Sequence, residues 1–345
     1  MTQANTQANS ATMGAGSPGD RAVRIGLLGC GSVGSAVARQ LVSRAELYAA
    51  RVGRPLDLVG IAVRNTASER ELGPVSADLL TTDAEAVVAR ADIVVEVMGG
   101  TEPARSLITQ ALSSGTPVVS ANKQLIAANG PALHSVARQG HTTFDYEAAV
   151  VAAVPVLRVV RESLAGDTIT SISGIVNGST NYILDMVTRH GLGFAEAVER
   201  AGVLGYLEAD PTEDLEGLDA AAKIVILARL AWGVDVTMAD VQRQGIAGLT
   251  DAHFEAAASS GQVIKLLASA WASGDPAAPR IELAVRPVSL GADDPLAQTR
   301  EGRNAVVIDT ELAGSLRLSG AGAGGAETAS AVLGDVVNAA RRLVG

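Results

Sequence analysis

Runs of apolar residues alternate with amphipathic stretches along the first part of the chain. The run at 23–28 leads through a glycine-rich turn into residues whose apolar positions recur with helical spacing. Further apolar runs at 56–64, 91–100 and 116–123 end in polar residues or glycine, and a helical stretch lies at 102–113. Because strands that alternate with helices pair in parallel, this pattern predicts an α/β fold with a doubly wound parallel sheet.

The pattern changes near residue 150. Helical spacing is found at 150–166 and 179–191, and strand-like stretches are found at 167–178, 261–272, 281–289 and 304–318. A helical stretch at 326–345 closes the chain. The mixture predicts an α+β domain followed by a final helix that packs back on the first domain.

The composition limits the classes of partner. A chain of 345 residues is long enough for two domains, each with its own core. Its net charge of −10 argues against nucleic acids and anionic membranes, because their phosphates would be repelled. No apolar run reaches the roughly 20 residues needed to cross a bilayer, and the N-terminus lacks the regions of a signal peptide. We therefore expect a cytoplasmic protein that acts on a small molecule.

Cysteine and histidine contribute little chemistry. The single cysteine, Cys30, excludes an intramolecular disulfide and a cysteine-rich metal site, and the four histidines lack metal-ligand spacing. Cys30 lies inside the glycine-rich turn, so thioester chemistry of the aldehyde dehydrogenase kind has no nucleophile. Hydride transfer to a carbonyl remains the simpler reaction.

The glycine-rich turn, GCGSVG at 29–34, fits G-x-G-x-x-G between a strand and a helix. Gly29 allows the tight turn, Gly31 lets a pyrophosphate approach the backbone, and Gly34 lets helix and strand pack closely. The phosphates then lie at the helix N-terminus, whose free N–H groups favour negative charge. This arrangement predicts a Rossmann-type dinucleotide-binding domain; a tight turn without a ligand is the alternative.

The end of the second predicted strand bears on the choice of dinucleotide. An acidic residue there would bond to the ribose hydroxyls of NAD, but the chain has Arg64 and Asn65. Arg64 is a counter-charge for the 2′-phosphate of NADP, so NADP(H) is expected in preference to NAD(H). A solvated charge at a strand end is the alternative for Arg64.

These elements divide the chain into parts. Residues 1–21, polar and of low complexity, are expected to form a disordered tail. Residues 22–150 form the dinucleotide-binding domain, which segment 320–345 completes, and residues 151–319 form a domain for substrate binding and dimerisation. The expected assembly is a homodimer or a dimer of dimers.

Several stretches, taken in order, resemble homoserine dehydrogenase over roughly residues 22–345. They are GCGSVG, VMGGTEP, SANKQLIA, NGSTNYIL, GYLEADPTEDLEGLDAAAK and SGAGAGGAETASAVLGD, and the block at 204–223 is highly specific. Enzymes of this family interconvert L-homoserine and L-aspartate 4-semialdehyde with NAD(P)(H), a step toward threonine and methionine. Many bacterial members carry a C-terminal ACT domain. Because this chain stops at Gly345, we expect no threonine inhibition through such a domain.

Within the 204–223 block, a lysine lies among apolar residues. On a helix that begins at about Asp214, Asp219 and Lys223 are four residues apart and form an ion pair beside an apolar stripe. Desolvation cancels most of the attraction in a buried pair, which favours a functional role over a stabilising one. A lysine in a dry pocket has a lowered pKa, suited to giving a proton to an aldehyde oxygen and retaking it. A surface helix pair is the alternative.

The resemblance assigns roles to these charged residues. It implies that Lys223 is the general acid/base and that Lys123 lies beside the nicotinamide and the substrate carbonyl. It gives Glu208 and Asp219 to the amino acid substrate, and Asp214 supplies a further carboxylate for the α-ammonium group. A plain helix-start lysine at 123 and a helix N-terminal charge at 214 are the alternatives.

Further site residues follow from the resemblance. Substrate contacts are expected at Tyr206 and Ser179, and Ser179 as the N-cap of a helix at 179–189 is the alternative. Cofactor contacts are expected at Gly29, Gly31, Val33, Gly34, Arg64, Gly99, Lys123, Gly205 and Gly324. A flexible hinge is the alternative for the glycines at 320–325.

The resemblance also implies a monovalent cation, usually sodium, held by backbone carbonyls after the first domain. The matching residues are Glu147, Val150, Ala152 and Val154. Alanines stand here where the family commonly has glycines, and they restrict the backbone of the loop.

Two other functions share some of these features. An amino acid dehydrogenase that acts at the α-carbon, such as aspartate dehydrogenase, would have the glycine-rich turn without the 204–223 block. A catalytically silent NADP-binding regulatory protein would keep the glycines but would not need Lys223 opposite carboxylates. The chain has both features, which favours a homoserine dehydrogenase.

Overall fold

The computed structural model describes residues 21–208, 210–275 and 279–345. Its first sheet has six parallel strands in the order β3-β2-β1-β4-β5-β6. The strands are β1 (Val23–Leu28), β2 (Leu56–Ala62), β3 (Leu80–Thr81), β4 (Ile93–Glu96), β5 (Val118–Ser120) and β6 (Phe144–Asp145). The predicted doubly wound parallel sheet is confirmed. The predicted disordered tail lies outside the described residues, apart from Arg21.

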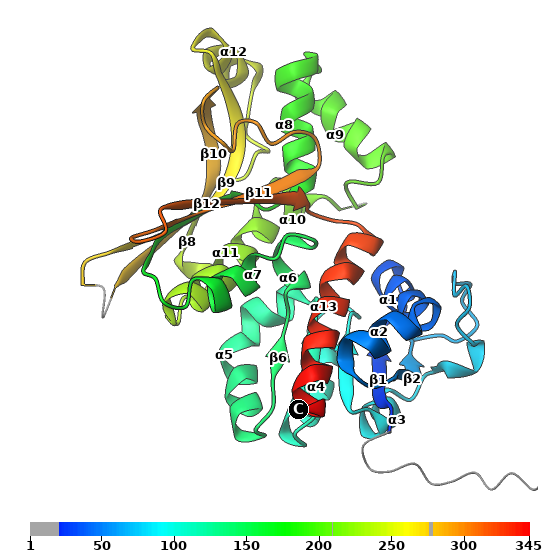
Figure 1. Ribbon diagram of the computed structural model, residues 1–345. Helices are drawn as coiled ribbons and strands as arrows, with labels where there is room; N and C mark the ends of the chain where they lie inside the picture. The colour runs from blue at the N-terminus through cyan, green and yellow to red at the C-terminus, as the bar shows by residue number, and fades with distance from the viewer. Residues whose placement is uncertain (1–20, 209, 276–278) are drawn as a thin grey trace, which may run out of the picture.

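Helices cover both faces of this sheet (Figure 1). They are α1 (Ser32–Ser43), α2 (Ala45–Val52), η1 (Ala77–Leu79), α3 (Ala84–Arg90), α4 (Ala104–Ser113) and α5 (Lys123–Gln139). The final helix, α13 (Gly325–Val344), packs against α1 and α2 although it lies at the other end of the sequence (Figure 1). Val332 and Val336 of α13 share a buried apolar cluster with Val37 and Leu41 of α1.

The second sheet also has six strands, in the order β12-β11-β7-β9-β10-β8. They are β7 (Ile169–Ile175), β8 (Val241–Arg243), β9 (Gln262–Ser273), β10 (Arg280–Gly291), β11 (Arg303–Thr310) and β12 (Ser315–Ala321). Neighbouring strands run antiparallel except for β8 and β10. The stretch at 304–318 is a hairpin rather than one strand, because Gly314 turns the chain with a positive φ of 75°.

Helix α11 (Leu218–Trp232) lies between the two sheets. It packs against α5 on one side and against β9 and β10 on the other, and its residues 219–228 are all buried. The other helices of this half are α8 (Gly178–His190), α9 (Phe194–Val203), α10 (Thr212–Leu215), η3 (Met238–Asp240) and α12 (Asp251–Ser259). Among the residues described, we find no helix both long and apolar enough to cross a membrane.

The helix predicted at 150–166 is wrong as a single element. The structure has α6 (Ala148–Val151), α7 (Val156–Arg158) and a π-helical turn, η2 (Val159–Ser163). Two residues explain the interruption. Ala152 adopts a φ of 43°, outside the helical region, and Pro155 has no N–H with which to continue a helix.

A buried ion pair lies in the second half. Lys265 of β9 is 1% exposed and donates to the side chain of Asn181 at 2.9 Å and to the carbonyl of Thr299 at 2.7 Å. Its Nζ lies 3.7 Å from Oδ1 of Asp185. Burial lowers the pKa of Lys265 to about 8, although the Asp185 carboxylate opposes this shift.

This pKa predicts a pH dependence of stability. In the unfolded chain a lysine titrates near ~10.4, so between about pH 8 and 10 the unfolded chain binds more protons than the folded chain. The stability of the wild type should therefore rise relative to that of Lys265→Met, by about 2 kcal/mol from pH 7.5 to 9.5. Urea unfolding at both pH values measures this difference, and a constant difference would contradict the shifted pKa.

Candidate active site

The glycine-rich turn joins β1 to α1. Gly29 has a φ of 101°, and a Cβ on Gly34 would lie 2.2 Å from the carbonyl oxygen of Gly29. A Cβ on Gly31 would meet no atom within 4 Å, so the space beside its backbone is open. Helix α1 has no side-chain cap and no acidic residue in its first turn, where Val33 lies. Its N-terminal N–H groups are thus available to an anion.

The loop after β4 lies against this turn. A Cβ on Gly29 would lie 2.7 Å from the carbonyl oxygen of Val97. Buried Glu96 accepts hydrogen bonds from the backbone of Met98 at 2.8 Å and from the hydroxyl of Ser120 at 2.7 Å. Burial raises the pKa of Glu96, against the effect of these bonds.

Asn122, which lies between β5 and α5, also holds the loop after β4. Its Nδ2 donates to the carbonyl of Gly100 at 2.6 Å, and its Oδ1 caps α5 by accepting from Leu125. Gly99, a predicted cofactor contact, is exposed in this loop with a φ of 75°. The sequence analysis missed the supporting roles of Glu96 and Asn122, because their partners are recognised only once the strands are paired.

Arg64 follows β2 and is exposed. Its side chain makes no hydrogen bond or ion pair with any residue that the structure describes. Neighbouring Asn65 accepts from the backbone of Ala67, and its carbonyl accepts from Arg70. The guanidinium of Arg64 is therefore free to meet an anion.

The carboxylate of Asp219 joins the two predicted catalytic lysines. Its Oδ1 lies 2.5 Å from Nζ of Lys123, the first residue of α5, and its Oδ2 lies 2.8 Å from Nζ of Lys223. Lys223 also donates to the carbonyl of Val176 at 2.7 Å and is 9% exposed. The structure thus brings together two lysines from different helices on one buried carboxylate.

Asn177 extends this network to Asp214. Its Nδ2 donates to Oδ1 of Asp214 at 2.5 Å and to Oδ2 of Asp219 at 2.9 Å. Asn177 was not predicted as a site residue. The only sign of its role in the sequence was its position as the first residue of the stretch NGSTNYIL. Its Oδ1 accepts from the backbone of Thr180 and caps α8, so the N-cap alternative for Ser179 is wrong.

The charges in the network influence each other. Burial alone raises the pKa of Asp219, but Lys223 and Lys123 together outweigh burial and hold it well below its ordinary range. Burial also lowers the pKa of Lys123, but Asp219 and the nearby carboxylates Glu213 and Asp214 outweigh it and raise the pKa. Burial raises the pKa of Asp214. Asp219 is thus ionised and Lys123 is protonated at neutral pH.

The predicted helix from Asp214 starts later than expected. Asp214 lies in the short helix α10, and Gly217, with a φ of 73°, separates α10 from α11. Asp219 and Lys223 remain four residues apart on α11. Asp214 and Asp219 thus lie on separate helices, and both accept a hydrogen bond from Asn177.

The remaining predicted substrate residues are Ser179, in the first turn of α8, and Tyr206 and Glu208, in the loop after α9. Ser179 donates to the carbonyl of Tyr206 at 2.7 Å, and the ring of Tyr206 stacks on Tyr182 with centroids 4.5 Å apart. Gly205 turns the loop with a φ of 77°. Glu208 is exposed and makes no hydrogen bond to another described residue. The structure does not bring Glu208 into the Asp219 network.

The glycine segment at the start of α13 lies close to the glycine-rich turn. Gly324 is the N-cap of α13 with a φ of 130°, and a Cβ on Gly325 would lie 3.1 Å from the carbonyl oxygen of Ser32. The segment therefore approaches the start of α1 closely.

The four residues of the predicted cation segment are buried. The side chain of Glu147 accepts from the backbones of Leu157 and Arg158, both at 2.8 Å, and burial raises its pKa to about 7. Ala152 has a φ of 43° and a ψ of −107°, a conformation that alanine rarely adopts.

We predict that Ala152→Gly stabilises the protein. Glycine takes this backbone conformation without the clash of a Cβ, which for alanine costs about 1–3 kcal/mol, although glycine loses about 0.5–1 kcal/mol through the entropy of the unfolded chain. The net gain should raise Tm by about 2 °C or more. Differential scanning calorimetry measures the change, and Ala153→Gly in the same loop is the matched control, expected to lower Tm.

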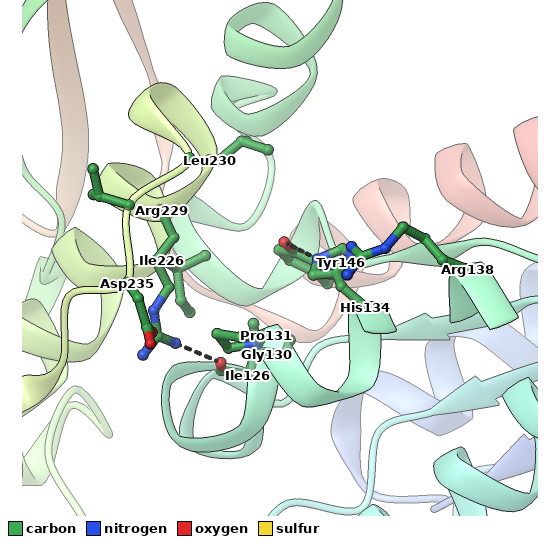
Figure 2. A pocket seen from close by; sticks show the side chains of 12 residues that line it. Ile126, Gly130, Pro131, His134, Arg138, Tyr146, Ile226, Arg229, Leu230 and Asp235 are labelled. Atoms are coloured by element: carbon green, nitrogen blue, oxygen red, sulfur yellow. Dashed lines mark hydrogen bonds between the residues drawn. The ribbon is translucent and has the colours of Figure 1, made fainter. Parts of the chain in front are cut away.

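A cavity of about 290 Å³ is lined by residues along α5 and in the C-terminal half of α11 (Figure 2). Its lining includes Arg229 of α11, which donates to the carbonyl of Ala127 on α5 at 2.7 Å. On the other wall His134 and the hydroxyl of Tyr146 are 2.7 Å apart. The lining includes none of the predicted site residues. Arg229 joins the two helices that carry Lys123 and Lys223, and so helps to hold these helices in place relative to each other.

Comparison with known proteins gives one family over most of the chain. The family model for homoserine dehydrogenase matches residues 155–337, and the model for its NAD-binding domain matches residues 29–147. Homoserine dehydrogenase of Mycobacterium bovis is 48% identical over 331 residues, 95% of this chain and 74% of the relative.

Solved structures agree with this result. Homoserine dehydrogenase of Thiobacillus denitrificans has a TM-score of 0.87 at 37% identity and covers 93% of this chain and 74% of its own. A hyperthermophilic archaeal homoserine dehydrogenase, solved in complex with NADPH, has a TM-score of 0.78 at 28% identity and covers 93% of this chain and 98% of its own.

Proposed function

The chain belongs to the homoserine dehydrogenase family, and from this premise we propose that Lys223 exchanges the proton while Lys123 supplies a fixed positive charge. The reaction is the interconversion of L-homoserine and L-aspartate 4-semialdehyde. A nicotinamide dinucleotide, when bound, donates or accepts the hydride. The observation that carries the proposal is the contact of both Lys123 and Lys223 with the buried carboxylate of Asp219, with N–O distances of 2.5 and 2.8 Å.

The proton is exchanged at Nζ of Lys223. During reduction the ammonium group gives a proton to the oxygen of the aldehyde, and during oxidation the neutral amine takes it from the hydroxyl of homoserine. Asp219 and the carbonyl of Val176 orient Nζ from two sides. Because Asp219 stays ionised, it holds Nζ of Lys223 in place without competing for the proton.

Lys123 has a different task. Its pKa is raised because Asp219, Glu213 and Asp214 outweigh the effect of burial, so it keeps its proton at neutral pH. A permanent charge near the carbonyl oxygen stabilises the negative charge that develops there. Its 32% exposed side chain leaves one side open to a ligand.

The carboxylates near this network suit an amino acid substrate. We assign the α-ammonium group to Asp214 and to Glu208 on the exposed loop, and the remaining substrate contacts to Tyr206 and Ser179. Glu208 is exposed in this structure, and we expect it to approach the network when the substrate binds. Its place on a loop rather than a helix supports such movement.

The cofactor is a nicotinamide dinucleotide, and we propose that NADP(H) is preferred. The free guanidinium of Arg64 at the end of β2 supports this preference, as does the archaeal relative solved with NADPH. The backbone at Gly29, Gly31, Val33 and Gly34 would hold the pyrophosphate, and Gly99, Gly205 and Gly324 line the approach. The division of the chain near residue 150 into cofactor and substrate domains is part of the same proposal.

Replacing Arg64 tests the cofactor preference. We expect Arg64→Leu to lower kcat/KM for NADPH about 10-fold to 100-fold, since a charge-assisted hydrogen bond contributes about 1.5–3 kcal/mol. The value for NADH should change less than about threefold, because NADH has no 2′-phosphate. Initial rates with each cofactor measure this, and Arg44→Leu, at an exposed arginine between α1 and α2, is the control. An equal loss with both cofactors would contradict the assignment.

We also propose a sodium ion at the backbone of Glu147, Val150, Ala152 and Val154. The sharp turn at Ala152, with its strained φ of 43°, supports a role for the shape of this loop. A rise in Tm with sodium but not with choline would support the ion.

We further propose a homodimer formed through the second sheet. Sedimentation equilibrium measures this oligomeric state.

One assay tests the central proposal. The absorbance of NADPH and NADP is followed with homoserine or its aldehyde product, with aspartate, and with no amino acid. Turnover with homoserine alone is expected. Turnover with aspartate would instead indicate chemistry at the α-carbon, and binding without turnover would indicate a regulatory protein.

A further inference from the structure

The side chain of Asn304 is buried without a partner. Asn304 is the second residue of β11 and is 0% exposed, and neither its Oδ1 nor its Nδ2 has a hydrogen-bond partner in the part of the chain that the structure describes. A buried polar group without a partner costs about 1–3 kcal/mol. Folded proteins therefore seldom leave both ends of a buried amide unpaired, unless a ligand or water completes it.

Two glycines enclose this amide. A Cβ on Gly322 would lie 2.1 Å from Nδ2 of Asn304, and a Cβ on Gly178 would lie 3.5 Å from its Oδ1. Any side chain at 322 would occupy the space that the amide now fills. The sequence thus leaves room for an amide group here and covers it with backbone alone.

The position of the amide connects the two halves of the site. Gly178 directly follows Asn177, which bonds to Asp219 beside Lys223. Gly322 belongs to the glycine segment that reaches Ser32 at the start of α1 through Gly325. The Asn304 amide is therefore packed against two segments, one that leads to the start of α1 and one that leads to the Asp219 network.

We propose that Asn304 binds the carboxamide of the nicotinamide ring. Hydride transfer requires the ring to lie between the pyrophosphate and the proton donor, and Asn304 contacts segments that lead to both. A carboxamide offers one acceptor and one donor, and the side chain of Asn304 offers the complementary pair. Contact requires the backbone at Gly322 to move aside, which the glycines at 320, 322, 324 and 325 permit. This inference rests on the proposed function.

Asn304→Leu separates a ligand contact from a structural one. Leucine keeps the branched shape but has no polar atoms, so the unfolding midpoint of the ligand-free protein should stay the same or rise. The Kd for NADPH, measured by isothermal titration calorimetry, should rise about 10-fold or more, because one to two hydrogen bonds are lost. The KM for homoserine at saturating cofactor should change by less than about threefold, which is under 1 kcal/mol.

Controls address packing and the chemistry of the ring. Asn304→Ala repeats the measurement without the bulk of leucine. Thr188→Val removes a buried hydroxyl that also has no hydrogen-bond partner among the described residues; it lies about 15 Å along α8 from Gly178, and its loss should leave the Kd unchanged. The 3-acetylpyridine analogue of the cofactor lacks the amide N–H donor. The wild type should bind it more weakly than NADP, and the Asn304 variants should no longer discriminate.

The outcomes are distinct. An unchanged Kd in both Asn304 variants would overturn the proposal, as would a fall in the ligand-free midpoint with both, which would indicate an internal water. A rise in the KM for homoserine alone would also overturn it, because the amide would then face the substrate. If the wild type shows no turnover of homoserine while Asn304→Leu weakens NADPH binding, the proposed function fails and the contact of Asn304 with the cofactor stands.

Discussion

Lys223→Met is expected to lower kcat with homoserine by about 100-fold to 10,000-fold, the range for loss of a general acid/base. The thioether fills the space of the lysine chain, so the loss reflects the missing proton exchange. Lys223 is the buried lysine of the network, held by Asp219 at 2.8 Å and by the carbonyl of Val176 at 2.7 Å. Initial rates in both directions, followed by NADPH absorbance, measure the effect.

A second buried lysine provides the control for this experiment. Lys265 is also buried beside a carboxylate, Asp185, but it belongs to the second sheet. Lys265→Met should therefore change stability while the folded protein keeps its kcat. A kcat of Lys223→Met within about tenfold of the wild type would contradict its role as the proton donor.

Asp219→Asn is expected to affect both stability and activity. The amide keeps the shape of the carboxylate but leaves Lys123 and Lys223 facing a neutral group. Leaving a buried charge without its partner costs about 3–5 kcal/mol, and loss of electrostatic orientation should lower kcat/KM about 100-fold to 1,000-fold. Urea unfolding and initial rates measure the two effects separately.

The sign of the pH dependence follows from the lowered pKa of Asp219. An unfolded aspartate titrates near ~3.9, so the stabilisation by Asp219 is fully present above that pH and is lost as the pH falls toward the folded pKa. The stability difference between wild type and Asp219→Asn should thus be constant from about pH 5 to 8 and shrink in stronger acid. A difference that shrinks between pH 8 and 5 would contradict a lowered pKa.

The parallel sheet could be predicted because its strands are buried on both faces and read as apolar runs. The ends of helices were harder to predict from sequence than the strands where a single backbone angle decides where a helix stops. Ala152 and Gly217 both adopt positive φ, and each divides what looked like one helix. Nothing in the spacing of apolar residues signals such a break, because it depends on the packing around the turn.

The candidate site shows the same limit. The pairing of Asp219 with Lys223 follows from helical spacing, so it could be predicted from sequence and is present in the structure. The bond from Lys123 to the same carboxylate joins two helices that are far apart in sequence, and no periodicity specifies it. Glu96, Asn122 and Asn177 were missed for the same reason, since a buried polar side chain is recognisable only by its partners.

The place of α13 in the sequence sets the order in which the nascent chain completes its cores. Val37 and Leu41 of α1 are synthesised early, yet their apolar neighbours Val332 and Val336 follow only after the whole second sheet. The strands of the second sheet, by contrast, are all available once Ala321 has emerged. Domains usually fold as they appear, N-terminal first. In this chain the second sheet can mature before the first domain, which must keep an apolar face open to chaperones until α13 has been synthesised.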